Sequence, residues 1–390
     1  MLRDTVRSIE TFIINIPRDV PYLGAARPGE EPNRFGYLVR KDNRTLYPTT
    51  DKSVIVKVTT QDGHVGWGET YGICAPRVVR VLIEELLAPV VEGRDPFDVQ
   101  VIWEDLYDLM RVRGYHSGFY LDALAGIDIA LWDLCGKLAG QPLHKLLGGA
   151  RRTSIPAYVS GLPKPTLPER IALAKEWMGR GFNAFKVHAV MSADSIVGDF
   201  AALRSELGPK ADLMVDLHWM FSPAEAISLI KALEPYRLTL VEAPCKPEDI
   251  QGLAQIARAS AIPIAVGEEW RTVFDARARL EQGAVSILQP EMGHKGITQF
   301  MRIARLGEAY HARIMPHATI GTGIFMAASL HASAALLNLP YHEYQPSIFD
   351  RNTKLLKGAM GCDKGQFTVP DGPGLGVEPD DALWQYVVDS

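Results

Sequence analysis

Three acidic residues at one repeating interval constrain the fold of this chain more than any other feature. Asp216, Glu242 and Glu268 are each 26 residues apart, and each closes an apolar run rich in strand-forming residues. The segments between these runs show helical apolar spacing, with turn residues at their ends. This alternation of strand and helix is typical of a parallel sheet, and the interval corresponds to one βα unit.

The same alternation continues on both sides of the three acids. Eight candidate strands follow Gly149, with seven helical segments between them, and this favours an α/β fold, a modified TIM barrel of (β/α)7β type. A doubly wound open sheet is the rival, but its glycine-rich first turn and topological switch point are not visible. The candidate strands cover residues 153–160, 183–188, 211–216, 238–242, 263–267, 285–289, 312–316 and 341–345.

The remaining length leaves room for a second domain. A barrel needs about 250 residues, and this chain has 390. Residues 4–16 and 53–59 and the segment HVGWGE indicate antiparallel strands, and residues 75–110 show a helical pattern. Residues 17–50 hold five prolines and little periodicity. A long loop between strands of a compact protein is usually functional, so we predict a lid there.

Composition excludes several kinds of partner. A hydrophobic fraction of 47% and a charged fraction of 22% are ordinary globular values, and a net charge of −5 offers no basic field for nucleic acid or an anionic membrane. The four cysteines form no CxxC motif, and the first residues lack the apolar core of a signal peptide. We therefore expect a cytoplasmic protein with reduced thiols and no membrane partner.

The three strand-end acids are candidate metal ligands. The C-terminal ends of barrel strands meet at one mouth, so Asp216, Glu242 and Glu268 would form a cluster of negatively charged oxygens. Such a cluster repels itself unless it holds a cation, and oxygen ligands favour Mg²⁺ over Zn²⁺. The alternative is that each acid caps the helix after its strand. The equal spacing and the basic residues nearby favour one bound Mg²⁺.

Two neighbouring strand residues are candidate proton acceptors. Lys186 and His188 in the segment FKVH share one face of a strand, and at the strand end this face is the barrel mouth. We expect burial near other cations to depress the pKa of Lys186 toward the range of a general base. The alternatives are a surface lysine and a hydrogen-bonded core histidine.

A second group of candidates lies on later strands. His317 follows one apolar run, and Glu291 ends the run before it. A carboxylate bound to imidazole Nδ1–H fixes the tautomer and raises the basicity of the other nitrogen, so these two residues form a plausible acid/base dyad. His218, two residues after Asp216, is a third candidate. A cation with such groups suits removal of the proton α to a carboxylate.

Motifs spread over nearly the whole chain carry a family resemblance: VGWGE, GIDIALWDLCGKLAGQPLHKLLGG, the three spaced acids, GEEW, ILQPE, IMPHATIGTG and PDGPGLGVE. The chain resembles the mandelate racemase subgroup of the enolase superfamily, acid-sugar dehydratases included. The resemblance implies one Mg²⁺ per subunit, a homo-oligomer from dimer to octamer, and an α+β capping domain formed by both termini. We accordingly predict a cap at 1–125 with its lid at 17–50, a barrel at 126–355, and a C-terminal segment, 356–390, that returns to the cap.

The chain departs from the family pattern at three positions. The usual Lys-x-Lys of the second strand is Lys186-Val187-His188 here, so the base on that face is His188 or is absent. The usual aspartate of the dyad is Glu291. The segment DLHW resembles the Asp-x-His of galactonate and mannonate dehydratases, which makes His218 a candidate general acid. These departures argue against racemization, which needs two matched bases, and they leave dehydration intact.

The predicted function is therefore Mg²⁺-dependent dehydration of a sugar acid, an aldonate or aldarate, through an enediolate to a 2-keto-3-deoxy acid. Alternatives are a racemase, epimerase or cycloisomerase that uses the same enediolate, and a non-catalytic barrel that binds sugar acids. Candidate substrate contacts lie at the mouth and in the lid: Glu343, Trp270, Tyr22, Arg34, Tyr37 and Arg40.

Overall fold

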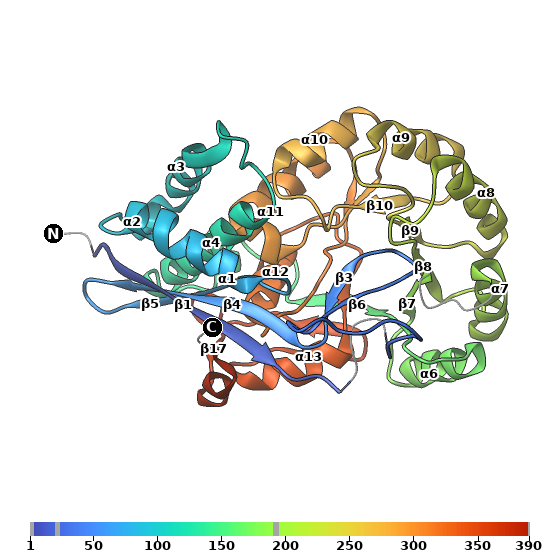
Figure 1. Ribbon diagram of the computed structural model, residues 1–390, viewed down its shortest axis with the longest axis horizontal. Helices are drawn as coiled ribbons and strands as arrows, with labels where there is room; N and C mark the ends of the chain where they lie inside the picture. The colour runs from blue at the N-terminus through green and yellow to red at the C-terminus, as the bar shows by residue number, and fades with distance from the viewer. Residues whose placement is uncertain (1–3, 20–23, 190–194, 389–390) are drawn as a thin grey trace.

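The structure is a computed structural model, and it describes residues 4–19, 24–189 and 195–388. It consists of a cap built on an antiparallel sheet and a ring of parallel strands surrounded by helices (Figure 1). Within these described ranges, no helix combines the length and the apolar character needed to cross a bilayer.

The cap contains a three-stranded sheet in the order β1-β4-β5, formed by β1 (Val6–Ile16), β4 (Asp51–Thr60) and β5 (Val65–Tyr71). Both pairings are antiparallel, as the sequence predicted. The cap helices follow directly along the chain and bury their apolar side chains in one cluster with this sheet. They are α1 (Pro76–Val81), the π-helical η1 (Leu82–Leu87), α2 (Ala88–Val91), the short η2 (Pro96–Asp98), α3 (Val99–Arg111) and α4 (Phe119–Leu138).

Helix α4 lies between the cap sheet and the barrel. Its residues are buried on nearly every side, because it contacts β5 on one face and barrel helix α11 on another. The sequence predicted only one buried stripe. Glycines at 66 and 68 of β5 permit the close packing, since a Cβ at either position would overlap a backbone carbonyl of α4. The helix continues without a break through residues 125 and 126, so the predicted domain boundary does not fall in a loop.

Two buried aspartates of α4 are bonded internally. Asp128 accepts a hydrogen bond from the Thr298 N–H at 2.9 Å. Asp133 accepts from the N–H groups of Trp67 and Leu375, each at 2.8 Å. These bonds join α4 to a barrel helix, to the cap sheet and to the C-terminal segment, so both aspartates hold the parts of the chain together.

The barrel has eight parallel strands and seven helices between them, which confirms the predicted (β/α)7β architecture. Each strand lies within a segment predicted as a strand, and the last one pairs with the first. The strands are β6 (Ser154–Ser160), β7 (Ala184–His188), β8 (Asp212–Asp216), β9 (Leu240–Glu242), β10 (Ile264–Val266), β11 (Ile287–Leu288), β12 (Arg313–Ile314) and β13 (His342–Tyr344).

Helices form the outer layer of the barrel, and those from α6 to α10 make a continuous arc in Figure 1. Three of them begin at capping boxes: Thr166 and Ser222 each exchange hydrogen bonds with the glutamate three residues later, and Thr272 does so with Asp275. The seven helices are α6 (Leu167–Gly179), α7 (Ile196–Leu207), α8 (Pro223–Leu233), α9 (Ile250–Ala259), α10 (Val273–Glu281), α11 (Met292–Ala309) and α12 (Ile324–Ala334). Short helices flank them: α5 (Leu143–Leu146), η4 (Glu234–Tyr236), α13 (Pro346–Asn352) and η5 (Thr353–Leu355).

The C-terminal segment contacts the barrel before it reaches the cap. Strand β16 (Gln366–Thr368) pairs with barrel strand β6. The N–H of Val388 then donates to the Ile13 carbonyl of β1 at 2.9 Å, so the end of the described chain lies against the cap sheet. The domain boundaries themselves stay predictions. The other elements of the segment are β14 (Leu356–Lys357), β15 (Gly361–Asp363), β17 (Glu378–Pro379) and η6 (Asp381–Tyr386).

The predicted lid carries a small hairpin, β2 (Tyr37–Val39) and β3 (Leu46–Pro48), that projects toward the middle of the barrel ring (Figure 1). A buried ion pair holds this region together, because Arg40 Nη1 lies 2.9 Å from Glu30 Oε2. Arg40 also donates to the backbone carbonyl of Gly24 at 2.6 Å. Arg40 therefore stabilises the lid from within.

Glu69 of β5 joins the cap to the start of barrel helix α12. The buried carboxylate accepts hydrogen bonds from the backbone N–H groups of Thr322 (2.5 Å), Ile324 (3.0 Å) and Phe325 (3.2 Å). It also accepts from the Ser53 hydroxyl at 2.6 Å. The first N–H groups of a helix have no partner within the helix, and Glu69 supplies that partner.

We expect Glu69→Gln to lower the free energy of unfolding by about 1–3 kcal/mol, because an amide nitrogen cannot accept the N–H groups that one carboxylate oxygen now binds. Urea denaturation measures the loss, and amide exchange should accelerate in the first turn of α12. Glu206→Gln is the control, since Glu206 is an exposed partner of Lys175 and its replacement should change stability little. Equal stability of the two variants would contradict the role given to Glu69.

Candidate active site

The predicted site residues meet at one end of the barrel. His188, Asp216 and Glu242 are direct neighbours across strands β7, β8 and β9. Glu268 stands two residues beyond the end of β10, the next strand in the ring. The three acids therefore lie at the same mouth of the barrel, with Asp216 and Glu242 side by side and Glu268 three residues past Ala265, the partner of Glu242.

The carboxylates of Asp216, Glu242 and Glu268 repel one another. Burial raises the pKa of Asp216 to about 6. Burial, together with the negative charges of Glu242 and Asp216, raises the pKa of Glu268 to about 8 against the opposing charge of His317. Asp216 and Glu242 are buried and Glu268 is half-buried, and carboxylates that disfavour their own ionisation need positive charge, so the donor set fits Mg²⁺.

Each of the three carboxylates also has a donor of its own. Glu242 binds Lys186, Glu268 Oε2 lies 3.1 Å from His317 Nε2, and Asp216 accepts from the His218 N–H at 2.8 Å. Across the part of the chain that the structure describes, one group of possible metal ligands has atoms within 4.8 Å of one another. That group is His188, Asp216 and His218, and not the three carboxylates.

Lys186 does not have the environment that we expected from the sequence. It is 1% exposed, and its Nζ lies 2.9 Å and 3.0 Å from the two Glu242 oxygens and 3.0 Å from Glu343 Oε1. Burial alone would lower the pKa of Lys186, but these two carboxylates outweigh it and raise the pKa well above its usual value. The predicted depression was wrong, because carboxylates and not cations surround the ammonium.

The structure brings His317 and Glu291 together. Nδ1 of His317 lies 2.7 Å from Glu291 Oε2, and that oxygen also accepts from the N–H and the hydroxyl of Thr319, both at 2.9 Å. This leaves Nε2 of His317 directed toward Glu268 (3.1 Å) and Glu343 (3.8 Å). The imidazole is thus oriented from one side and faces the acidic cluster with the other.

Charge sets the protonation of this dyad. Burial alone would lower the pKa of His317, but the carboxylates of Glu268, Glu343 and Glu291 outweigh it and raise the pKa to about 10. Burial would raise the pKa of Glu291, but the hydrogen bond and charge of His317 lower it to about 2. Both shifts favour an imidazolium paired with a carboxylate, a form in which His317 has a proton to donate.

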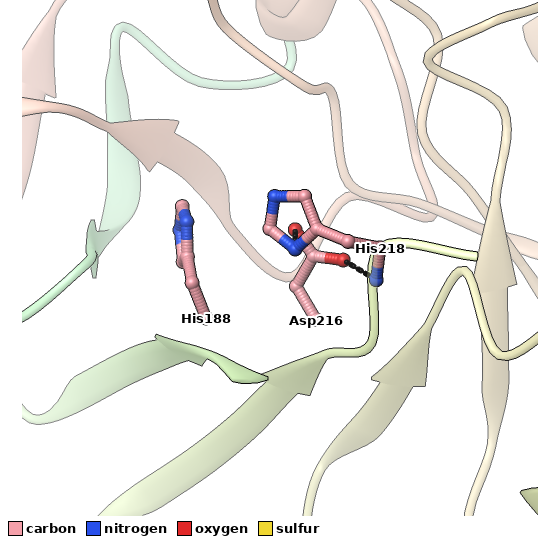
Figure 2. Close-up of side chains that lie close together, drawn as sticks. All are labelled: His188, Asp216 and His218. Carbon is pink, nitrogen blue, oxygen red and sulfur yellow. Dashed lines mark hydrogen bonds and ion pairs between the residues drawn. The ribbon is translucent and has the colours of Figure 1, made fainter. Parts of the chain in front are cut away.

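The His218 ring lies over the carboxylate of Asp216, and His188 lies beside both (Figure 2). The centroids of the two imidazole rings are 5.2 Å apart. Burial lowers the pKa of His218 to about 4 and that of His188 well below its usual value, so both rings are neutral. The backbone at His218 and Trp219 is left-handed, with φ of 48° and 53°, and such strain concentrates at functional sites.

Two predicted substrate contacts, Glu343 and Trp270, are buried and have partners within the protein. Glu343 is buried, is paired with Lys186, and accepts from the Ala318 N–H at 2.8 Å. Trp270 is 1% exposed, and the Arg279 guanidinium lies 5.4 Å from its ring centre. These contacts show Glu343 to be a charge partner inside the site and Trp270 to be packed below the surface.

The lid candidates contact the cap. The Tyr37 hydroxyl accepts from the Ala75 N–H at 2.8 Å, and the exposed Arg34 guanidinium lies 4.7 Å from the ring centre of Phe35. The contact of Tyr37 is thus with the cap and that of Arg34 is within the lid, and a substrate contact of either residue stays a prediction. Tyr22 lies outside the described residues.

Two residues at strand ends were missed by the sequence analysis. Gln289 donates its amide to Glu242 Oε2 at 2.6 Å. The Ser160 Oγ lies 3.3 Å from His188 Nε2. Both residues stand at or just past the end of a predicted strand, so their position at the barrel mouth was the signal that could have found them.

Tyr47 of the lid hairpin was missed as well. Burial raises the pKa of Tyr47, and the negative charges of Asp216 and Glu268 add to this effect. Asn43 donates to its hydroxyl at 2.8 Å. The hairpin thus brings one phenol near the acidic cluster, and the lid sequence offers no periodicity from which this could have been predicted.

Sequence comparison shows the family of this chain. Residues 43–148 match the mandelate racemase / muconate lactonizing enzyme N-terminal domain, and residues 169–383 match the enolase C-terminal domain-like family. The second match covers more than half of the chain. The chain belongs to the mandelate racemase and muconate lactonizing enzyme family of the enolase superfamily.

Named relatives divide between two activities. The D-galactarolactone cycloisomerase of Agrobacterium fabrum is 35% identical over 347 residues, which cover 85% of this chain and 90% of the relative. The D-galactonate dehydratase of Ralstonia pickettii is 34% identical over 357 residues, with 87% and 92% covered. Both names are those of sugar-acid enzymes. One is an isomerase by name and the other is a lyase by name, so the names do not select one reaction class for this chain.

Solved structures agree with the fold. A putative isomerase from Sinorhizobium meliloti is 55% identical, with a TM-score of 0.97 over 99% of this chain and 100% of that one. A racemase from Streptomyces coelicolor A3(2) with bound magnesium is 26% identical, with a TM-score of 0.83 over 98% and 100% of the two chains. The capping domain and the barrel are therefore arranged as in other members of the family.

Proposed function

We propose that this protein is a Mg²⁺-dependent dehydratase of a sugar acid, an aldonate or aldarate, that yields a 2-keto-3-deoxy acid. One observation carries the proposal: His317, oriented by Glu291, faces an acidic cluster that also borders the half-buried His188. A donor and an acceptor of protons are what loss of an α-proton and a β-hydroxyl requires. The named relatives support a sugar acid as the substrate.

Asp216, Glu242 and Glu268 are the residues proposed to hold Mg²⁺. When bound there, the cation would supply Lewis-acid stabilisation of the negative charge that develops on the substrate carboxylate. Lys186 and Gln289 hold the Glu242 side chain in position toward this cluster.

The proton acceptor proposed for the α-carbon is His188 in place of Lys186. The Lys186 ammonium is engaged by Glu242 and Glu343, whereas the Nδ1 of His188 is buried without a hydrogen-bond partner among the described residues. The α-proton moves to this nitrogen. His218, with a neutral ring across Asp216, is the second candidate for the same step.

His317 is the proposed proton donor to the leaving group. Glu291 and Thr319 fix the dyad, so the proton on Nε2 points toward the acidic cluster. As the bond between the β-carbon and its oxygen breaks, this proton joins the departing hydroxyl to form water. The enol that remains takes up a solvent proton at the β-carbon and releases its hydroxyl proton, which gives the keto acid. His188 then returns its proton to solvent and His317 takes one up, so atoms and charges balance.

A cycloisomerase is the second candidate, and the 35% identical relative named D-galactarolactone cycloisomerase favours it. In a reaction of that class on a lactone, a ring oxygen would leave in place of the hydroxyl, with the same two proton transfers. A homo-oligomeric assembly stays a prediction for either activity.

Mass spectrometry distinguishes the two candidates. Purified protein with Mg²⁺ is offered aldonates, aldarates and their lactones, and keto products are trapped with semicarbazide. A keto acid lighter than its substrate by one water supports the dehydratase, and a ring-opened product of unchanged mass supports the cycloisomerase. Conversion of none of these compounds would contradict both.

A further inference from the structure

Three side chains at the ends of β7 and β8 converge in a way that the proposed reaction does not require. Figure 2 shows the His218 ring over the carboxylate of Asp216, with His188 beside them. One ligand atom from each residue lies within 4.8 Å of the others. His188 is half-buried, and Asp216 and His218 contribute little surface, so water competes weakly for these atoms.

The surroundings of the two ring nitrogens favour one tautomer of His188. Nε2 lies 3.3 Å from the Ser160 oxygen, which can accept its proton. A proton on Nδ1 would have no acceptor among the described residues. This leaves the lone pair on His188 Nδ1, and that atom is buried with no hydrogen-bond partner among the residues described.

His218 also has an Nδ1 atom without a hydrogen-bond partner among the described residues. Nδ1 of His218 lies 3.0 Å from Asp216 Oδ2, yet the two do not have the geometry of a hydrogen bond. The other oxygen of Asp216, Oδ1, is held by the His218 backbone N–H at 2.8 Å, which fixes the carboxylate. A nitrogen and a carboxylate oxygen at this distance without a shared proton suit a cation that binds both.

We propose that His188, Asp216 and His218 form a site for a borderline divalent cation of the Zn²⁺ class. Imidazole nitrogens favour Zn²⁺ and its transition-metal neighbours, whereas Mg²⁺ prefers an all-oxygen set. Two imidazoles and one carboxylate are a ligand set that differs from Asp216, Glu242 and Glu268, although Asp216 belongs to both. The inference goes beyond the proposed function, because binding at this site needs no substrate and no turnover.

A cation at this site would occupy two groups of the proposed reaction. It would bind the Nδ1 lone pair of His188, the proposed proton acceptor, and one oxygen of Asp216. Ser160 acts on the site as a positioning residue, because its bond to Nε2 keeps Nδ1 unprotonated.

Titration calorimetry of the metal-free protein with Zn²⁺ tests the proposal. We expect one bound Zn²⁺ per chain. Ser160→Ala should weaken binding by about 10- to 100-fold, as loss of a partner of a metal-ligating histidine does, and His188→Asn and His218→Asn should each weaken it further. His311→Asn is the matched control, since His311 is exposed and its φ of 57° suits asparagine. It should leave binding unchanged.

X-ray absorption of the Zn²⁺-loaded wild-type protein gives a test that does not depend on any variant folding. Two imidazole nitrogens should lie about 2.0–2.1 Å from the ion. A zinc shell without imidazole would overturn the proposal, as would failure to bind Zn²⁺ or equal affinity in the wild type and the two histidine variants.

Discussion

The His317→Asn variant is expected to lose turnover, with kcat about 10²- to 10⁴-fold below wild type, the range of a lost general acid or base. Asparagine can keep a hydrogen bond to Glu291, whose oxygen lies 2.7 Å from the imidazole Nδ1, but it cannot transfer a proton. The variant should remain folded and should still bind Mg²⁺. Steady-state kinetics, circular dichroism and Mg²⁺ calorimetry on the same preparation measure these three properties.

The matched control for this result is His311→Asn, which makes the same exchange at an exposed position away from the mouth. Its kcat should equal that of the wild type. Near wild-type kcat in His317→Asn itself would remove His317 from the mechanism and leave the Glu291 dyad with a purely structural role.

The second large effect is expected for Lys186→Met. Removing one partner of a buried ion pair costs about 3–5 kcal/mol, and here Glu242 and Glu343 would both lose their cation. The free energy of unfolding, measured by urea denaturation, should fall by that amount. Added Mg²⁺ should recover part of the loss, because a ligand that binds the folded state stabilises it and restores positive charge near Glu242.

Lys175→Met provides the comparison, since Lys175 pairs with Glu206 on the exposed surface and its loss should change stability little. If Lys186→Met were as stable as Lys175→Met, the two carboxylates would not depend on Lys186 for charge compensation. The assignment of Lys186 as a fixed ammonium would then fail.

The barrel was predictable because its signals are local in the sequence. Each parallel strand is a short apolar run, and each acid stands at or just past the end of its strand, so counting residues was enough to expect all three at the same mouth of the barrel. The family motifs added the cap, whose strands and helices also show their patterns within short windows.

The environment of Lys186 could not be predicted in this way. Glu343 stands on β13, which closes the ring by pairing with β6, so its approach to Lys186 depends on the whole barrel. The burial of α4 on nearly every side likewise depends on two layers that are distant in sequence. Tyr47 reaches the site through a hairpin in a segment without periodicity.

Proton nuclear magnetic resonance of the reaction in D₂O tests the central claim most directly. Wild-type protein with Mg²⁺ is given the sugar acid that it converts, and the positions of hydrogen in the product are assigned. Removal of the α-proton, loss of the β-oxygen and uptake of a solvent proton predict one deuterium at C3 of the 2-keto-3-deoxy acid. A keto acid that retains only protium at C3 would contradict the account.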